Sequence, residues 1–195
     1  MERFLILLIG YAFGCFQSSF ILVKLFKKED IRNAGSGNAG TMNALISHGI
    51  GFGTATLILD AAKTVFSCVL CLALFENLGY ETTISYCALG VALGHEFPFW
   101  LKFKGGKGVA VALAFMLMLD YRVFLLSGIM SIPVMMITKK LRLGSVAIAG
   151  MMALCVFSLY SYEIGLIVLV QSGLIIYLHL ADLLASDKNK KKIEN

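Results

Sequence analysis

Long runs of apolar residues, separated by short polar stretches, dominate this chain of 195 residues. The runs are continuous rather than alternating, which is typical of membrane-spanning helices and not of the strands of a β-barrel. Seven such segments are predicted to be transmembrane: 4–23, 52–75, 83–101, 109–119, 123–137, 143–160 and 164–184. As a helix the fourth is only about 16 Å long, against a hydrocarbon core of about 30 Å. We therefore expect the short fourth and fifth segments to be sheltered by neighbours or to form one bent hairpin.

The composition supports a membrane protein. Hydrophobic residues make up 58% of the chain, charged residues 15%, and the mean hydropathy is +0.83. These values exclude an ordinary soluble domain of this size. All 5 cysteines lie in apolar segments. Cys68 and Cys71 have the C-x-x-C spacing of a redox or metal motif, but no His or further Cys is nearby, so the cysteines are interpreted as packing residues. The sequence predicts an all-α polytopic membrane protein, with one integral membrane domain over residues 1–187 and a basic tail at 188–195.

The distribution of basic residues predicts the topology. Of the 17 Lys and Arg residues, all but Arg3, Lys63 and Arg122 fall in the loops after the first, third and fifth segments or in the C-terminal tail. Positively charged loops remain in the cytoplasm. We therefore expect seven spans, with the N-terminus outside and the C-terminus cytoplasmic. Basic residues confined to such loops do not favour nucleic-acid binding.

Two features inside the apolar segments are interpreted first as packing. Gly10 and Gly14 have the G-x-x-x-G spacing that allows two helices to approach closely. Asp60 and Lys63 are three residues apart in the second segment, so we expect them to neutralise each other inside the bundle.

The stretch 95–110 carries the strongest chemical signal. It contains Lys104, Gly105, Gly106, Lys107 and Gly108 immediately before an apolar helix. Glycine lets backbone N–H groups crowd around an anion, lysine supplies charge, and the start of a helix adds a positive dipole end. The spacing is not that of a nucleotide-binding P-loop. The loop is therefore predicted to bind phosphate at the cytoplasmic surface.

Three further polar groups are expected on the same side of the membrane. The stretch 33–43 combines glycines with hydroxyl and amide side chains, and is interpreted either as a flexible loop or as a polar hairpin that binds a ligand. His179 and Asp182 share one helix face where the last segment ends. Arg142 and Ser145 begin the sixth segment.

In this order, these residues resemble the acyl-phosphate-dependent glycerol-3-phosphate acyltransferases of bacterial membranes, the PlsY family. The resemblance covers the whole chain. It includes Gly35 to Gly40 followed by Asn43, then Gly94-His95 with Phe97-Pro98, and the run from Phe103 to Ala110. Leu143-Gly144-Ser145 and Tyr177 with His179 match the remaining positions.

The resemblance implies transfer of a fatty acyl group from acyl phosphate to the 1-hydroxyl of glycerol 3-phosphate. The products are lysophosphatidic acid and phosphate, and the reaction begins bacterial phospholipid synthesis. It implies an enzyme of the bacterial inner membrane that needs no cofactor. Its active site faces the cytoplasm, and it depends on another enzyme for acyl phosphate.

The resemblance also assigns site residues. The implied catalytic residues are Ser36, Lys104 and His179. The implied substrate- and phosphate-binding residues are Gly37, Asn38, Gly40, Thr41, Asn43, Gly105, Gly106, Lys107, Gly108, Arg142, Ser145 and Asp182.

The sequence departs from the family pattern at Met42, Ile46, Arg142 and Asp182. At position 46 the family has an arginine, and Arg142 is the candidate to replace its charge. Asp182 stands where the family has an asparagine. Three alternatives to the glycerol-3-phosphate acyltransferase stay open: an acyltransferase with another acceptor, a non-catalytic relative and a transporter.

Overall fold

The computed structural model describes residues 1–194, with side chains as far as Leu184, so the side chains of the basic tail predicted at 188–195 lie outside the described residues. Helices, turns and loops account for residues 1–194, and no strand occurs among them. The chain divides into two compact units, with the boundary between Leu119 and Asp120. Each unit is described by itself.

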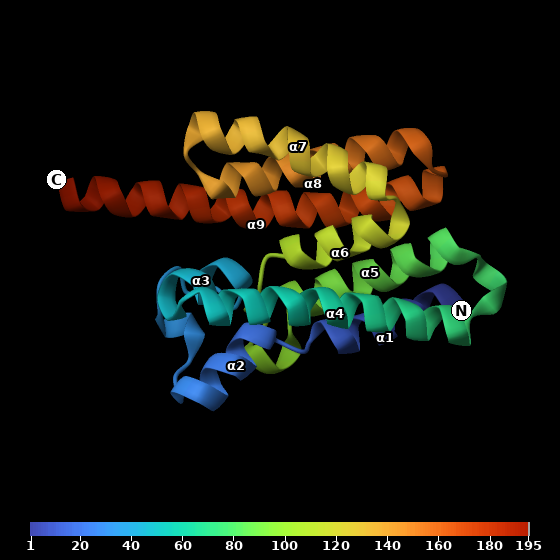
Figure 1. Ribbon diagram of the computed structural model, residues 1–195, viewed down its shortest axis with the longest axis horizontal. Coiled ribbons are helices and arrows are strands. Elements are labelled where there is room, and N and C mark those ends of the chain that lie inside the picture. The colour runs from blue at the N-terminus through green and yellow to red at the C-terminus, as the bar shows by residue number, and fades with distance from the viewer. Residues whose placement is uncertain (195) are drawn as a thin grey trace. The chain divides into compact units, whose positions relative to one another are not determined.

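The first unit contains a bundle of helices in which α1, α4 and α5 lie side by side (Figure 1). Its α-helices are α1 (Glu2–Gly14), α2 (Ser18–Lys27), α3 (Thr41–His48), α4 (Ile50–Leu74), α5 (Tyr80–Glu96) and α6 (Val109–Leu119). Its short 3-10 helices are η1 (Ile31–Asn33), η2 (Glu76–Leu78) and η3 (Phe99–Leu101).

The second unit consists of α7 (Tyr121–Thr138), α8 (Leu141–Leu159) and α9 (Tyr162–Glu194), with α8 packed against both other helices. Asp120 caps the start of α7, because its Oδ1 accepts a hydrogen bond from the Arg122 backbone N–H at 2.8 Å. The Tyr160 hydroxyl donates to the other carboxylate oxygen of Asp120 at 3.3 Å, which ties the end of α8 to the start of α7.

The predicted apolar segments are helical, with two differences. The first segment breaks at Cys15–Gln17 into α1 and α2, and α5 ends at Glu96 rather than at the predicted Leu101. Pro98 accounts for the second difference, since the residue before a proline is disfavoured in helical geometry. The fourth segment forms α6 with the predicted bounds.

Five helical segments among the described residues are long and apolar enough to cross a membrane. They are Glu2–Lys27, Ile50–Leu74, Tyr121–Thr138, Leu141–Leu159 and Tyr162–Leu184. The structure therefore confirms an all-helical protein with membrane-spanning segments. Helices α5 and α6 are shorter, with 17 and 11 residues.

The contact between α1 and α5 is a backbone-to-backbone contact made by glycines on both helices. A Cβ atom built at Gly10 would collide with the Cys87 carbonyl oxygen, and one at Gly14 would collide with that of Val91. Gly90 and Gly94 on α5 face α1 in the same way. The predicted close approach at Gly10 and Gly14 is confirmed, and its partner is a second G-x-x-x-G on α5.

We predict that Gly90→Ala destabilises the protein by about 1–3 kcal/mol, because the added methyl group overlaps the Leu7 carbonyl and the backbone must move. The matched control is Gly51→Ala on α4, where nothing lies within 4 Å of the added Cβ and alanine favours the helix. Thermal unfolding in detergent measures both variants. Equal midpoints for the two variants would contradict the glycine contact.

Candidate functional site

The glycine-lysine loop folds back onto the end of α5. The N–H of Gly106 donates to the His95 carbonyl at 2.9 Å, and the N–H of Gly105 donates to the Glu96 carbonyl at 3.1 Å. A Cβ at Gly106 would collide with Nε2 of the His95 ring, and one at Gly105 with the His95 carbonyl oxygen. Both glycines are therefore required by close approach, and both amides are used to hold the loop.

The charged groups of this loop remain accessible at its surface. Lys104 is exposed and Lys107 is half-buried. Gly108, with a φ of +78°, leads into α6. The first turn of a helix has backbone N–H groups without partners inside that helix. The loop thus presents two ammonium groups close in sequence to a helix start, an arrangement that favours an anion.

The stretch 33–43 is organised around one buried side chain, that of Asn43. Its Nδ2 donates to the carbonyl oxygens of Ile31, Ala34 and Asn38 at 2.9–3.0 Å. Its Oδ1 accepts from the Ser36 backbone N–H at 2.9 Å. The stretch is therefore a defined hairpin whose last residues, from Thr41, form the first turn of α3.

Asn43 holds this hairpin, whereas Ser36 is exposed at its tip. Ala39 of the hairpin is buried in an apolar cluster with Val23, Ile31 and Ala44. The hydroxyl of Thr41 is buried without a hydrogen-bond partner among the described residues.

The hairpin and the glycine-lysine loop lie next to each other. A Cβ built at Gly40 would lie 3.8 Å from the Gly106 Cα, which is an ordinary van der Waals contact. Arg32 Nη1 donates to the carbonyl of Leu101 at 3.1 Å, just before the loop. The structure therefore brings together the two glycine-rich motifs of the first unit.

Arg32, which the sequence interpretation counted only as a charge, organises the base of these loops. Both carboxylate oxygens of Asp30 accept hydrogen bonds from its guanidinium group. Because of this pairing, the pKa of Asp30 is lowered from its usual value. The guanidinium also lies over the ring of Phe20, 5.3 Å from its centroid, and Phe20 packs edge-on against Trp100.

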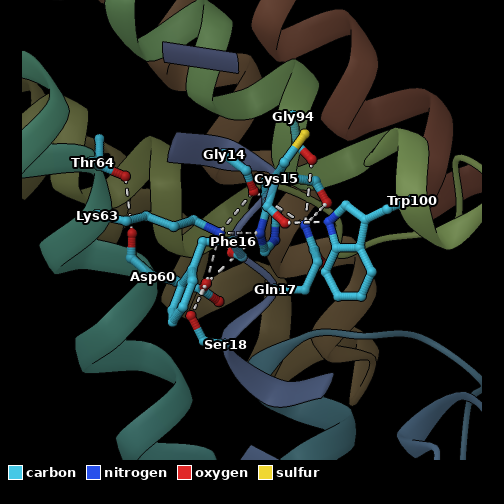
Figure 2. A network of polar contacts seen from close by, with 11 residues as sticks. Gly14, Cys15, Phe16, Gln17, Ser18, Asp60, Lys63, Thr64, Gly94 and Trp100 are labelled. Carbon is cyan, nitrogen blue, oxygen red and sulfur yellow. Dashed lines mark hydrogen bonds and ion pairs between the residues drawn. The ribbon is translucent and has the colours of Figure 1, made fainter. Parts of the chain in front are cut away.

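A buried charged cluster lies behind the loop (Figure 2). The Lys63 Nζ is 2.9 Å from the Asp60 carboxylate, which confirms that these residues neutralise each other within the first unit. The cluster also includes His95, whose Nδ1 is 2.9 Å from Lys63 Nζ. The sequence interpretation assigned no such contact to His95.

The second unit holds the remaining predicted residues. Arg142 Nη1 donates to the carbonyl of Asp182 at 3.1 Å, so these two residues are close together. The Ser145 hydroxyl bonds to the Leu141 carbonyl within α8. His179 is buried, and its Nδ1 donates to the carbonyl of Ile175 at 2.8 Å, which leaves Nε2 as the acceptor of the neutral ring.

Comparison with known proteins gives one consistent result. A family model described as glycerol-3-phosphate acyltransferase matches residues 4–185. Glycerol-3-phosphate acyltransferase of Pelagibacter ubique is 36% identical and aligns over 100% of this chain and 95% of its own length. Glycerol-3-phosphate acyltransferase 1 of Lactobacillus johnsonii is 34% identical over 91% of this chain and 85% of its own length.

Two solved structures have the same fold. The crystal structure of PlsY, an integral membrane glycerol 3-phosphate acyltransferase, in its glycerol 3-phosphate form has a TM-score of 0.83 and 26% identity to this chain. The match covers 97% of this chain and 94% of that one. The lysophosphatidic acid form has a TM-score of 0.79 and 25% identity, over 95% and 93% of the two chains.

We predict that Asn43→Ala loosens the hairpin, because the Ser36 N–H and the Asn38 carbonyl lose their hydrogen bonds to this side chain, while the carbonyls of Ile31 and Ala34 keep only their backbone partners. Each lost hydrogen bond costs about 0.5–1.5 kcal/mol. Hydrogen–deuterium exchange of residues 31–43 is expected to rise. Asn33→Ala, at an exposed position of the same stretch, is the control and is expected to leave exchange unchanged. Unchanged exchange in Asn43→Ala would contradict the organising role of this side chain.

Proposed function

Since the chain belongs to the glycerol-3-phosphate acyltransferase family, we propose that it transfers a fatty acyl group from acyl phosphate to the 1-hydroxyl of glycerol 3-phosphate. The products are lysophosphatidic acid and inorganic phosphate, the first step of bacterial phospholipid synthesis. The observation that carries the proposal is the proximity of the two glycine-rich motifs, where a Cβ added at Gly40 would lie 3.8 Å from the Gly106 Cα. This proximity supports one polar site for two phosphate-bearing substrates.

The proposed step needs few groups. The substrate hydroxyl oxygen attacks the acyl carbonyl carbon, the bond between that carbon and the phosphate oxygen breaks, and the hydroxyl proton goes to a phosphate oxygen of the donor. Lys104 and Lys107 neutralise phosphate and stabilise the charge that develops in the transition state. Ser36 and Asn38 orient the substrates. Nε2 of His179 accepts a hydrogen bond from a glycerol hydroxyl when the ring is neutral and donates one to a phosphate when the ring is protonated. The proposed step uses no cofactor or metal ion.

The remaining assigned residues shape the phosphate site. Gly105 and Gly106 contribute mainly by letting the loop pack against α5, since their amides are already hydrogen-bonded. Gly37 and Gly40 are likewise proposed to shape the backbone of the hairpin. Gly37 has a φ of +72°. Other contacts to the substrates are proposed for Thr41, Gly108, Ser145 and Asp182, whereas Asn43 is proposed to shape the site through its hydrogen bonds within the hairpin.

The acyl chain is proposed to lie between helices. An open cavity of about 510 Å³ between α1 and α4 supports this placement. Its walls are apolar and include Phe13, Phe16, Leu59 and Phe66. A chain of this chemistry gains from leaving water for such a surface.

For the whole protein we propose seven spans, counting the short α5 and α6 as two of them. The positive-inside rule places the N-terminus outside and the C-terminus and active site in the cytoplasm of a bacterial inner membrane. Residues 1–187 are proposed to act as one acyltransferase domain, and residues 188–195 as a basic cytoplasmic tail. A partner enzyme of the cell must supply acyl phosphate.

A second candidate acceptor is favoured by one observation. Ile46, which replaces the family's arginine, is 73% exposed on α3, so an anion-binding charge is missing from an accessible position. Loss of a hydrogen bond to a charged group costs about 1.5–3 kcal/mol. Arg142 is proposed to restore this charge; within the second unit its guanidinium donates a hydrogen bond to the Asp182 backbone carbonyl. Without that compensation, a different acceptor would be the substrate.

The first test is phosphate release by detergent-purified protein given palmitoyl phosphate, with and without glycerol 3-phosphate. Release that requires glycerol 3-phosphate and yields lysophosphatidic acid is the expected result. No release with this acceptor, followed by release with another polyol phosphate, would transfer the assignment to the second candidate. No release with any acceptor would overturn the catalytic proposal.

We predict that Lys104→Ala reduces acyl transfer by about 10- to 100-fold or more, because it removes a charge-assisted contact to phosphate. The control is Lys102→Ala, which removes an exposed lysine of the same loop and is expected to retain most activity. Initial rates under the same assay compare the two variants. Similar losses in both would mean that general positive charge, and not Lys104, attracts the substrate.

A further inference from the structure

The break in the first apolar segment leaves backbone carbonyls without helical partners. Helix α1 ends at Gly14 and α2 begins at Ser18. Inside a bilayer such carbonyls must be bonded by protein groups, since no water is available to bond them. The Trp100 Nε1–H donates to the Cys15 carbonyl at 2.8 Å (Figure 2).

Lys63 bonds a second carbonyl of the break. From α4 its side chain reaches across to the bend, where Nζ donates to the Phe16 carbonyl at 2.7 Å (Figure 2). The Gly14 carbonyl is farther away, at 3.3 Å, and also accepts a hydrogen bond from Gln17 Nε2 at 3.2 Å, so the three N–H donors of Lys63 serve Phe16, Asp60 and His95. Asp60 fixes the ammonium group from the other side at 2.9 Å, and the Ser18 hydroxyl donates to the same carboxylate oxygen at 2.7 Å. Lys63 therefore links two helices at a defined point.

The same ammonium group determines the protonation of His95. An ammonium nitrogen has only donors, so the His95 Nδ1, 2.9 Å away, must present its lone pair. The ring proton is then on Nε2. A doubly protonated ring would place two positive charges in contact in a buried site, where His95 is 3% exposed.

The other edge of the His95 ring supports the glycine-lysine loop. Nε2 lies against the Cα of Gly106, so closely that a Cβ there would collide with it. The backbone of His95 also accepts the Gly106 N–H at 2.9 Å. Any rotation of the ring would therefore displace Gly106, and Lys63 is the group that opposes this rotation.

We propose that Lys63 is a positioning residue for the glycine-lysine loop: held by Asp60, it fixes His95 as the neutral Nε2–H tautomer against Gly106. The inference deepens the proposed function and rests on the phosphate-binding role of that loop. A buried ion pair contributes little net stability compared with apolar residues of similar size. The attraction between the two charges is thus expected to add little to stability, whereas the bonds of Lys63 to the Phe16 carbonyl and to His95 fix the bend and the ring.

The first test is nitrogen NMR of the detergent-solubilised full chain with ¹⁵N-labelled histidine. The His95 signals, assigned by their loss in His95→Asn, are expected to show a protonated Nε2 and an unprotonated Nδ1. Lys63→Met is expected to abolish this fixed tautomer. An Nδ1–H or doubly protonated His95 in the native protein, or an unchanged tautomer in Lys63→Met, would overturn the inference.

The second test compares two substitutions of His95. Asparagine places a carbonyl oxygen near the position of Nδ1 and retains an acceptor for Lys63, whereas glutamine places its amide near Nε2. Asparagine loses the ring edge that lies against Gly106, and glutamine loses the acceptor for Lys63, so both variants are expected to raise the KM for palmitoyl phosphate about tenfold or more. A native KM in His95→Gln would show that Lys63 does not act through Nδ1, and a native KM in His95→Asn would show that the ring edge at Gly106 does not position the loop.

Loss of the fold is separated from loss of positioning by a double variant studied well below its unfolding temperature. Asp60→Asn with Lys63→Met removes both buried charges together and leaves the Phe16 carbonyl without its Lys63 donor, so thermal unfolding is expected to stay cooperative at a lowered midpoint. At a temperature where the double variant is fully folded, exchange of the Gly105 and Gly106 amides is expected to increase about tenfold or more, as in Lys63→Met alone. Lys24→Met, an exposed lysine on α2, is the control with native exchange. Native exchange in the double variant would overturn the inference.

These readouts distinguish the two proposals. If the native protein forms no lysophosphatidic acid, the proposed function fails, whereas the tautomer and amide exchange still decide whether Lys63 positions the loop. If acyl transfer occurs and the tautomer does not depend on Lys63, only the positioning role fails.

Discussion

Unpaired carbonyl groups inside a hydrophobic environment are the constraint on which this structure depends. The first span unwinds between Gly14 and Ser18, and its carbonyls need donors that a bilayer does not supply. Lys63 of α4 and Trp100 of η3 supply such donors from outside the break, and Gln17 supplies one from within it, to the Gly14 carbonyl. A buried lysine must be neutralised, and Asp60 neutralises Lys63. The Lys63 ammonium group also contacts His95 Nδ1, so His95 belongs to the same cluster. One backbone irregularity thus accounts for an entire buried polar cluster.

The glycine-rich motifs divide their residues between internal hydrogen bonds and the exposed surface. Asn43, Gly105 and Gly106 use their hydrogen-bonding groups within the protein, whereas Ser36 and Lys104 are exposed. A loop built in this way is organised before any ligand binds, so little ordering entropy is lost on binding. Exposed groups on a fixed backbone are the arrangement that favours transition-state stabilisation by prearranged charges.

Patterns local in sequence predicted much of the fold. The bounds of α6, the Asp60–Lys63 pair and the close approach at Gly10 and Gly14 all follow from residue spacing on a helix. The sequence interpretation missed features that depend on distant contacts. The polar run Gln17-Ser18-Ser19 inside an apolar segment was the available signal for the break, but the donors that stabilise it come from residues 63 and 100. Spacing likewise could not show that Asn43 faces its own hairpin.

Trp100 gives this protein a single intrinsic fluorophore next to the glycine-lysine loop. It is the only tryptophan of the chain, 42% exposed, packed on Phe20 and hydrogen-bonded to the carbonyl of Cys15. Its indole therefore lies where the first-span break meets the start of the glycine-lysine loop. Indole emission depends on local polarity and hydrogen bonding. A change in the structure of the break or of the loop on ligand binding would therefore change the emission of Trp100. Fluorescence titration of the unlabelled, unmodified protein would thus report structural change where the break meets the loop.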